Sequence, residues 1–130
     1  MLRSVCHSDL ITKNFWLFND DFFIMDKVRE DVNYFNGSLE KRVIDLRRKY
    51  PCGSGYINQL ESLRNKLIRM NKDALSFAIH VPMLINRHKG LEIIKKNFCP
   101  MCRSVYFNYY SICCQFMEDV KIYDLETVPD

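Results

Sequence analysis

Four of the six cysteines lie in one stretch, and their spacing could hold a metal ion. Cys99 and Cys102 form a Cys-Pro-Met-Cys turn, and Cys113 and Cys114 follow after ten intervening residues. Two thiolates separated by two residues can bind one ion from a tight turn, because the backbone N–H groups of the turn steady both sulfurs. The spacing predicts a site for one zinc ion. The alternative is a set of buried free thiols, since cysteine is among the most buried residue types.

The sequence leaves the fourth ligand of this predicted tetrahedral site open. Cys99, Cys102 and Cys113 supply three ligands, and the candidates for the fourth are Cys114, His88, His80 and Cys52. His88 lies eleven residues before Cys99, where it could reach the turn, although a surface histidine is the alternative. His80 precedes Val81-Pro82 on an apolar face, which favours a core histidine. Cys52 lies in a Pro-Cys-Gly-Ser-Gly turn, and Cys6 is expected to have no role.

Composition places the chain among ordinary globular proteins. Its 130 residues include 48% hydrophobic and 27% charged residues, which predicts a single domain over 1–130. The formal net charge of +3 permits contact with nucleic acid without arguing for it. No run of about 18 apolar residues and no signal-peptide pattern is present, so neither a membrane span nor secretion is expected. The thiols are then expected to be reduced. The six cysteines are therefore expected to be metal ligands or core residues and not to form disulfides.

Known catalytic motifs are missing from the chain. It has no Gly-x-Ser-x-Gly elbow, no His-Glu-x-x-His helix, no glycine-rich phosphate loop and no deaminase signature. A thiol enzyme would need a nucleophile outside the cysteine stretch, and Cys6 and Cys52 have few reactive neighbours in the sequence. The sequence therefore favours a non-enzymatic protein.

Helical spacing of apolar residues predicts the elements that precede the cysteines. After the apolar run 15–18, a first helix ending at Asn36-Gly37 is indicated by Phe22, Met25, Val28, Val32 and Phe35. Ser38 caps a second helix, which Pro51 and Gly53 end. The third helix, over 54–71, has an apolar face formed by Ile57, Leu60, Leu63, Leu67 and Met70.

Shorter elements are expected to lead the chain to the cysteine turn. Asp73 caps a short helix through Ile79, Pro82 begins another over 83–88, and Gly90 interrupts it before an apolar face resumes at Leu91. The Val-, Tyr- and Phe-rich residues between the cysteines favour a hairpin within 98–116. The predicted fold is thus mainly α with a small C-terminal β-hairpin: a helical part, 1–97, and a zinc-knuckle hairpin with a terminal element, 98–125. Segment 117–125 fits an edge strand or a frayed helix.

The stretch FCPMCRSVYFNYYSICCQF, residues 98–116, resembles the opening half of a RING finger. With its length and its Asn/Ile/Lys/Phe-rich composition, the whole chain is similar to the baculovirus U-box/RING-like family. On that resemblance Cys99 and Cys102 form the first knuckle, and Cys113 with Cys114 take the place of the central Cys and His. No Cys or His follows Cys114, so a full RING with two cross-braced zinc ions is not expected. The resemblance then implies either a remnant of a RING finger that binds one zinc ion or a U-box-like scaffold.

The resemblance implies a function in virus assembly. Members of the family are associated with nucleocapsid assembly, which implies viral capsid or other viral proteins as partners. It also implies a location in the host nucleus and cytoplasm and in the virion nucleocapsid. Two alternatives stay open: a ubiquitin ligase or ligase adaptor that binds a ubiquitin-conjugating enzyme, and a basic zinc-binding module for nucleic acid.

Overall fold

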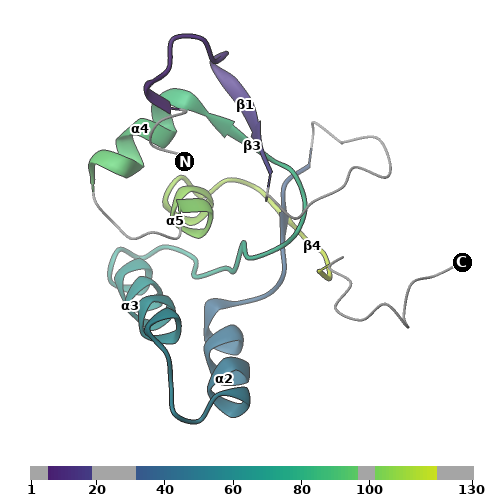
Figure 1. The fold of residues 1–130 in the computed structure, drawn as a ribbon, viewed down its shortest axis with the longest axis vertical. Coiled ribbons are helices and arrows are strands. Elements are labelled where there is room, and N and C mark those ends of the chain that lie inside the picture. The colour runs from purple at the N-terminus through teal and green to yellow at the C-terminus, as the bar shows by residue number, and fades with distance from the viewer. Residues whose placement is uncertain (1–5, 19–31, 97–101, 120–130) are drawn as a thin grey trace, which may run out of the picture.

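The polypeptide folds into helices and short strands in a computed structural model that describes residues 6–18, 32–96 and 102–119. In chain order the elements are β1 (Asn14–Leu17), β2 (Tyr34–Phe35), α2 (Leu39–Lys49), α3 (Gly55–Arg69), β3 (Met83–Asn86), α4 (Arg87–Lys95), α5 (Cys102–Tyr109) and β4 (Gln115–Phe116) (Figure 1). In these ranges the fold is mixed α and β, with four helices and two two-stranded sheets. The elements do not confirm a RING-like arrangement.

Helices α2 and α3 confirm the second and third predicted helices. The Ser38 side chain accepts a hydrogen bond from the Lys41 backbone N–H, and Ser54 does the same for Ile57. Both hydroxyls thereby satisfy donors that a helix start would otherwise leave unpaired. The apolar face of α3 is buried as expected, through Ile57, Leu60, Leu63 and Leu67.

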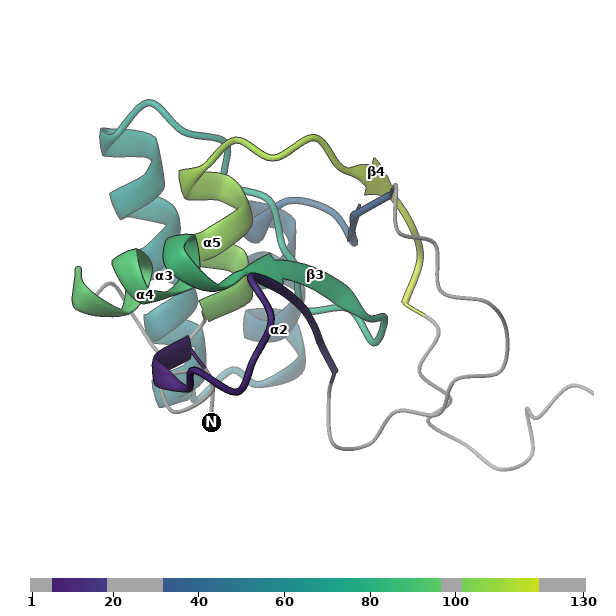
Figure 2. The ribbon, with the colours of Figure 1, turned by 90° about the horizontal axis from the view of Figure 1, so that it is seen from above.

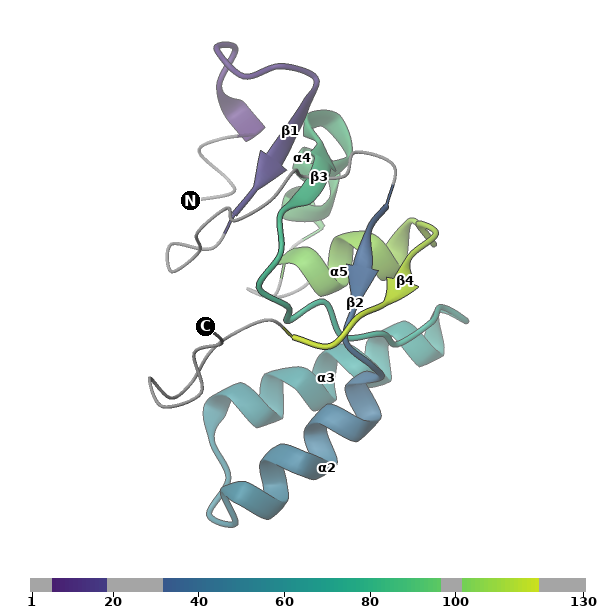
Figure 3. The same cartoon turned by 90° about the vertical axis from the view of Figure 1, so that its right-hand side faces the viewer.

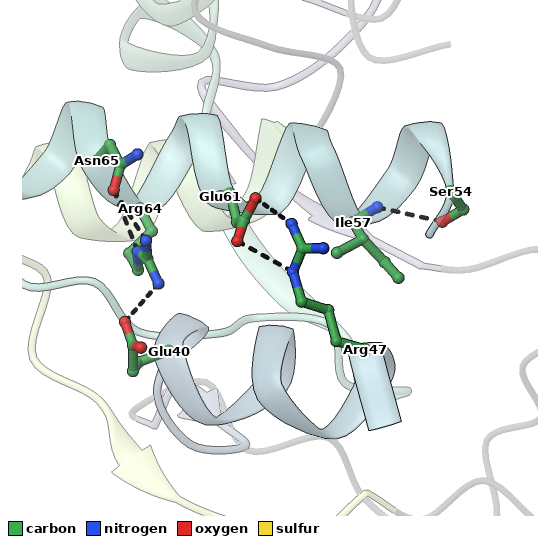
Figure 4. Close-up of polar contacts among 7 residues, drawn as sticks. All are labelled: Glu40, Arg47, Ser54, Ile57, Glu61, Arg64 and Asn65. Atoms are coloured by element: carbon green, nitrogen blue, oxygen red, sulfur yellow. Dashed lines mark hydrogen bonds and ion pairs between the residues drawn. The ribbon is translucent and has the colours of Figure 1, made fainter. Parts of the chain in front are cut away.

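Two ion-pair groups connect α2 to α3 on their outer side (Figure 4). Arg47 donates two hydrogen bonds to the Glu61 carboxylate, at 3.1 and 2.5 Å. Arg64 donates to Glu40 at 2.6 Å and to the Asn65 side-chain oxygen. The hydrogen bonds from Arg47 lower the pKa of Glu61 below its ordinary value.

Strands β1 and β3 pair antiparallel, with Phe15 opposite Ile85 and Trp16 opposite Leu84. The predicted helix over 83–88 is therefore wrong over 83–86, where Met83 and Ile85 alternate with more exposed neighbours in a strand pattern, and its last two residues belong to a helix that begins at Arg87. The first predicted helix is wrong at its end, where Tyr34 and Phe35 form β2, and its centre, 19–31, lies outside the described residues.

Helix α4 runs through Gly90, so the predicted interruption there is also wrong. The Asn86 side chain accepts a hydrogen bond from the Lys89 backbone N–H and caps the helix. A Cβ at Gly90 would lie 2.9 Å from the Cys6 sulfur, so glycine permits the close approach of Cys6. Cys6, for which no role was expected, is only 1% exposed and belongs to the core.

Segment 73–80 is extended, so the predicted helix from Asp73 to Ile79 is wrong. Its even-numbered residues bond to the chain around β2: Asn36 N–H donates to the Ser76 carbonyl at 3.0 Å, and Ser76 N–H donates to Gly37 at 2.8 Å. The Leu39 backbone N–H donates to Ala74 at 2.7 Å. These bonds give one side of the segment the hydrogen-bonding pattern of a strand.

Helix α5 replaces the hairpin that was predicted between the cysteines. Its side chains bond to the odd-numbered residues of segment 73–80. Asn108 accepts from the Leu75 N–H at 2.9 Å and donates to the Leu75 carbonyl at 2.8 Å, while Ser104 accepts from the Phe77 N–H at 3.1 Å. Arg103 donates to the Ile79 carbonyl at 2.9 Å. The polar face of α5 thus takes the place of a neighbouring strand.

Helix α5 lies between two layers of the fold. Figures 1 and 3 show α4 with β1 and β3 on one side of α5, and α2 with α3 on the other. Its buried residues Val105, Tyr106 and Phe107 join the core, where the Phe77 and Phe107 rings stack at 4.8 Å. Figure 2 shows the helices gathered at one side, with β3 and β4 extending toward the other. Within the described ranges, every helix is too short or too polar to cross a membrane.

Replacing Asn108 with Leu should lower the free energy of unfolding by about 2 kcal/mol, because it leaves the half-buried Leu75 N–H and C=O without their partner. Asn58→Leu, on the exposed surface of α3, serves as the control and should change it by less than about 0.5 kcal/mol. Urea unfolding of the full chain measures both. Equal stabilities of the two variants would contradict the role assigned to Asn108.

The Arg47–Glu61 pair predicts a dependence of stability on pH. Because the folded-state pKa of Glu61 is lowered, its contribution is present above the ordinary glutamate pKa of about 4.3 and is lost as the pH falls through the lowered pKa. Glu61→Gln should therefore be less stable than the parent at neutral pH, and the difference should shrink on acidification. Urea unfolding of Arg47→Gln, Glu61→Gln and the double variant checks this. Additive losses in the double variant would contradict the pairing.

Candidate functional site

The end of α5 directs the two adjacent cysteines toward β4. Ser111 adopts a left-handed φ of 49°, and the Ile112 N–H donates to the Phe107 carbonyl at 3.1 Å, which ends the helix with a reversal of the chain. Cys113 and Cys114 then follow before β4 begins at Gln115. Helix termination therefore fixes where these two thiols lie.

The two thiols have different surroundings. Cys113 is exposed, whereas Cys114 is half-buried and its thiol donates to the Ile112 carbonyl at 3.1 Å. Burial raises the pKa of Cys114 to about 11, and the neighbouring Cys113 adds to the rise. The Cys114 thiol is thus a weaker nucleophile than an exposed thiol at neutral pH, because the thiolate is the reactive form.

A cavity of about 240 Å³ lies beside these thiols. It is lined by Asp73, Leu75, Phe77, Phe107, Asn108, Ser111, Ile112, Cys113 and Cys114. A cavity of roughly 150 Å³ can hold benzene, so this one is large enough for an aliphatic or aromatic side chain. The Asn108 side chain is already bonded to Leu75, so the polar groups at the cavity that a ligand could meet are mainly those of Asp73 and Ser111, beside apolar walls.

Strand β4 runs next to the cavity, and the described part of the chain pairs with one of its two edges. The Gln115 N–H donates to Asn33 at 2.8 Å, and the Met117 N–H donates to Phe35 at 2.9 Å. In this parallel pairing the Phe116 backbone groups face the other edge, where the described residues supply no strand. The open edge of β4 can accept an extended segment of another chain.

Phe116 connects this edge to the core through a line of aromatic rings. Its ring meets Phe35 at 5.9 Å between centroids, Phe35 meets Phe77 at 6.4 Å, and Phe77 stacks on Phe107 at 4.8 Å. Phe116 itself is 62% exposed. We name Cys113–Phe116 together with the adjoining cavity the β4 surface.

Helix α5 separates the predicted zinc ligands. Cys102 begins the helix, and Cys113 follows after the other end of this eight-residue helix, which is about 10 Å long. In the backbone, the helix therefore lies between the position of Cys102 and those of Cys113 and Cys114. Cys99 lies outside the described residues.

The remaining candidates for the fourth ligand lie elsewhere. His88 is exposed on α4, and Cys52 is exposed in the turn after α2. The His80 ring nitrogen Nδ1 lies 2.8 Å from Asp119 Oδ2, and the His80 backbone N–H donates to the same carboxylate. Among the residues that the structure describes, His, Cys, Asp and Glu form no group of three able to hold a metal. Zinc remains a prediction that rests on the Cys99–Cys102 turn.

Sequence reasoning did not assign a role to Phe116 or Asn108. Phe116 looked like the last apolar residue of a hairpin, and only the reversal at Ser111 brings it to an exposed edge. Asn108 sits four residues after Ser104, a spacing that places both side chains on one helix face. That pair of small polar residues inside an apolar run was the available signal for a helix.

Zinc content of the full chain, purified without chelator, tests the metal prediction. Cys99→Ser and Cys102→Ser should release the ion, because structural zinc contributes roughly 10 kcal/mol or more of binding free energy. Cys52→Ser, in the distant α2–α3 turn, should retain it. Cys113→Ser tests the ligand set, since the separation by α5 predicts retained zinc. A parent content below about half an equivalent would contradict the zinc prediction.

Comparison with known proteins gives no relative for this chain. No family model, no curated protein and no solved structure matches it. The β4 surface is therefore interpreted from its own residues.

Proposed function

We propose that this protein is a non-enzymatic assembly factor that binds other viral structural proteins through the β4 surface. The observation that carries the protein-binding part is Phe116, which is 62% exposed on an open strand edge beside the cavity. The nucleocapsid, as the place of assembly, and the host nucleus and cytoplasm come from the resemblance of residues 98–116 to the U-box/RING-like family.

An extended partner segment fits this surface in two ways. Its backbone can pair with the Phe116 backbone groups, for which the described residues supply no strand partner, as in recognition by strand addition. One of its apolar side chains can fill the cavity lined by Leu75, Phe77, Phe107 and Ile112. Buried aromatic anchors in a pocket supply most of the affinity at many protein interfaces, so a two-residue edge can be sufficient when a side chain accompanies it.

Zinc at Cys99 and Cys102 would add a stabilising element at the end of α5 that lies opposite this site. Both residues precede or begin α5, whose other end forms the cavity wall. A metal there would hold the start of α5, and the cavity would remain formed by the residues around its end. The protein-binding proposal therefore does not depend on the ion.

Phe116→Ser should reduce the amount of protein in purified nucleocapsids several-fold, because the partner loses its apolar contact on β4. Ile68→Ser on α3 is the matched control, since Ile68 is 59% exposed and lies away from β4. Quantitative mass spectrometry gives the ratio of the protein to the major capsid protein, and thermal unfolding shows that both variants fold. A parent protein absent from nucleocapsids, or an unchanged ratio for Phe116→Ser, would contradict the proposal.

A purified ubiquitination reaction separates the alternative function. A ligase would promote ubiquitin chains in the presence of a ubiquitin-conjugating enzyme, whereas an assembly factor would not. Chains that form with the parent and are lost in Phe116→Ser would identify the β4 surface as the binding site of that enzyme instead.

A further inference from the structure

The cavity beside β4 combines apolar walls with one carboxylate at its opening. The apolar walls belong to Leu75, Phe77, Phe107 and Ile112, and both phenylalanines are buried. Asp73 also lines the cavity and is exposed, which places it where the cavity meets solvent. A side chain that enters the cavity therefore contacts hydrocarbon along its length and a carboxylate near the opening.

The Asp73 carboxylate has no ion-pair or hydrogen-bond partner among the residues that the structure describes. Glu61, by contrast, is held by Arg47, and Asp119 accepts a hydrogen bond from the His80 backbone N–H. An exposed carboxylate without a partner is ordinary where only water surrounds it. At the opening of an apolar cavity, the same carboxylate can pair with a cation that a bound side chain carries.

Lys72, the next residue in the chain, is engaged by other groups. Its ammonium donates to the Ser111 hydroxyl at 3.3 Å and lies 6.0 Å from the Tyr109 ring centroid. Ser111 also lines the cavity, so an ammonium and a carboxylate both lie at its border. Because Lys72 has these contacts and Asp73 has none among the described residues, the group that complements this border is a cation, which Lys72 repels in part.

We propose that the partner segment at the β4 surface places a lysine side chain in this cavity. The methylene groups of lysine pack against the apolar walls, and its ammonium pairs with Asp73 at the opening. Arginine fits less well, because its planar guanidinium needs several acceptors, and Asp73 is the one carboxylate among the described residues that line the cavity. The inference rests on the proposed function and narrows it, since the apolar side chain that fills the cavity then ends in a cation.

Three small probes that share an aliphatic stem test the inference on the full chain. They are n-pentylammonium, n-pentanol and n-pentanoate, which differ in the charge of the end group. Amide chemical shifts of Leu75, Phe107 and Ile112, followed during titration, report binding at the cavity. Pentylammonium should bind about threefold more tightly than pentanol, because a partly exposed ion pair contributes modestly, and pentanoate should bind most weakly.

Substitutions of the two adjacent charged residues should change the affinity in opposite directions. Asp73→Asn should abolish the preference for pentylammonium over pentanol, whereas Lys72→Gln should increase that preference about twofold by removing a repulsive charge. Asp45→Asn, at an exposed position on α2, removes the same charge as Asp73→Asn and should leave the preference unchanged. An equal affinity of all variants for the uncharged pentanol shows that the cavity remains formed.

Several results would overturn the inference: no binding of any probe, equal affinities of the parent for pentylammonium and pentanol, tightest binding of pentanoate, or equal effects of Asp45→Asn and Asp73→Asn. Tighter binding of n-butylguanidinium than of pentylammonium would overturn the choice of lysine. The probes carry no peptide backbone that could pair with β4. A parent that prefers pentylammonium, together with an unchanged nucleocapsid ratio for Phe116→Ser, would therefore support the cation preference of the cavity and contradict the assembly function.

Discussion

The hydrogen bonds between α5 and the extended segment 73–80 organise the fold. Ser104 and Asn108 bond to Phe77 and Leu75 on one side of the segment, and the chain around β2 bonds to its other side. Segment 73–80 thereby connects α5 to the start of α2 and to β2, and β4 pairs with β2. Side chains can replace a strand here because their four-residue spacing on a helix matches alternate residues of an extended chain.

The same constraint shapes the candidate site. Asn108 and Ser104 hold α5 against the segment, so the helix keeps Cys102 at one end and Cys113 at the other. The end at Ser111 then presents Cys114 and β4 beside a cavity whose walls belong to the core. The β4 surface is consequently built on residues of the core, and a surface that packing holds in place would lower the entropy cost of receiving a partner.

Much of the α2–α3 pair could be predicted from sequence, because Ser38 and Ser54 cap helices whose apolar residues recur at helical spacing. The prediction failed where long-range contacts outweigh local preference. Val105, Tyr106 and Phe107 favour a strand, yet their burial in the core and the bonds of Asn108 stabilise a helix. Gly90 resembled a helix breaker in the sequence. A glycine is needed there because the Cys6 sulfur lies close to it, and Cys6 is 84 positions away in the chain, so no local pattern indicates the contact. The cysteines were found as a group, but the helix that divides them was not predictable from their spacing.

The contact of Cys6 with Gly90 makes the thiol a reporter of motion at the N-terminal segment. Arg87 holds that segment by donating to the Ser8 and Ile11 carbonyls, and β1 pairs it to β3. The sulfur has no room for an added group while it faces Gly90. A reagent can reach it only after the segment separates from α4, so the rate of Cys6 alkylation gives the free energy of that local opening without unfolding α2 and α3.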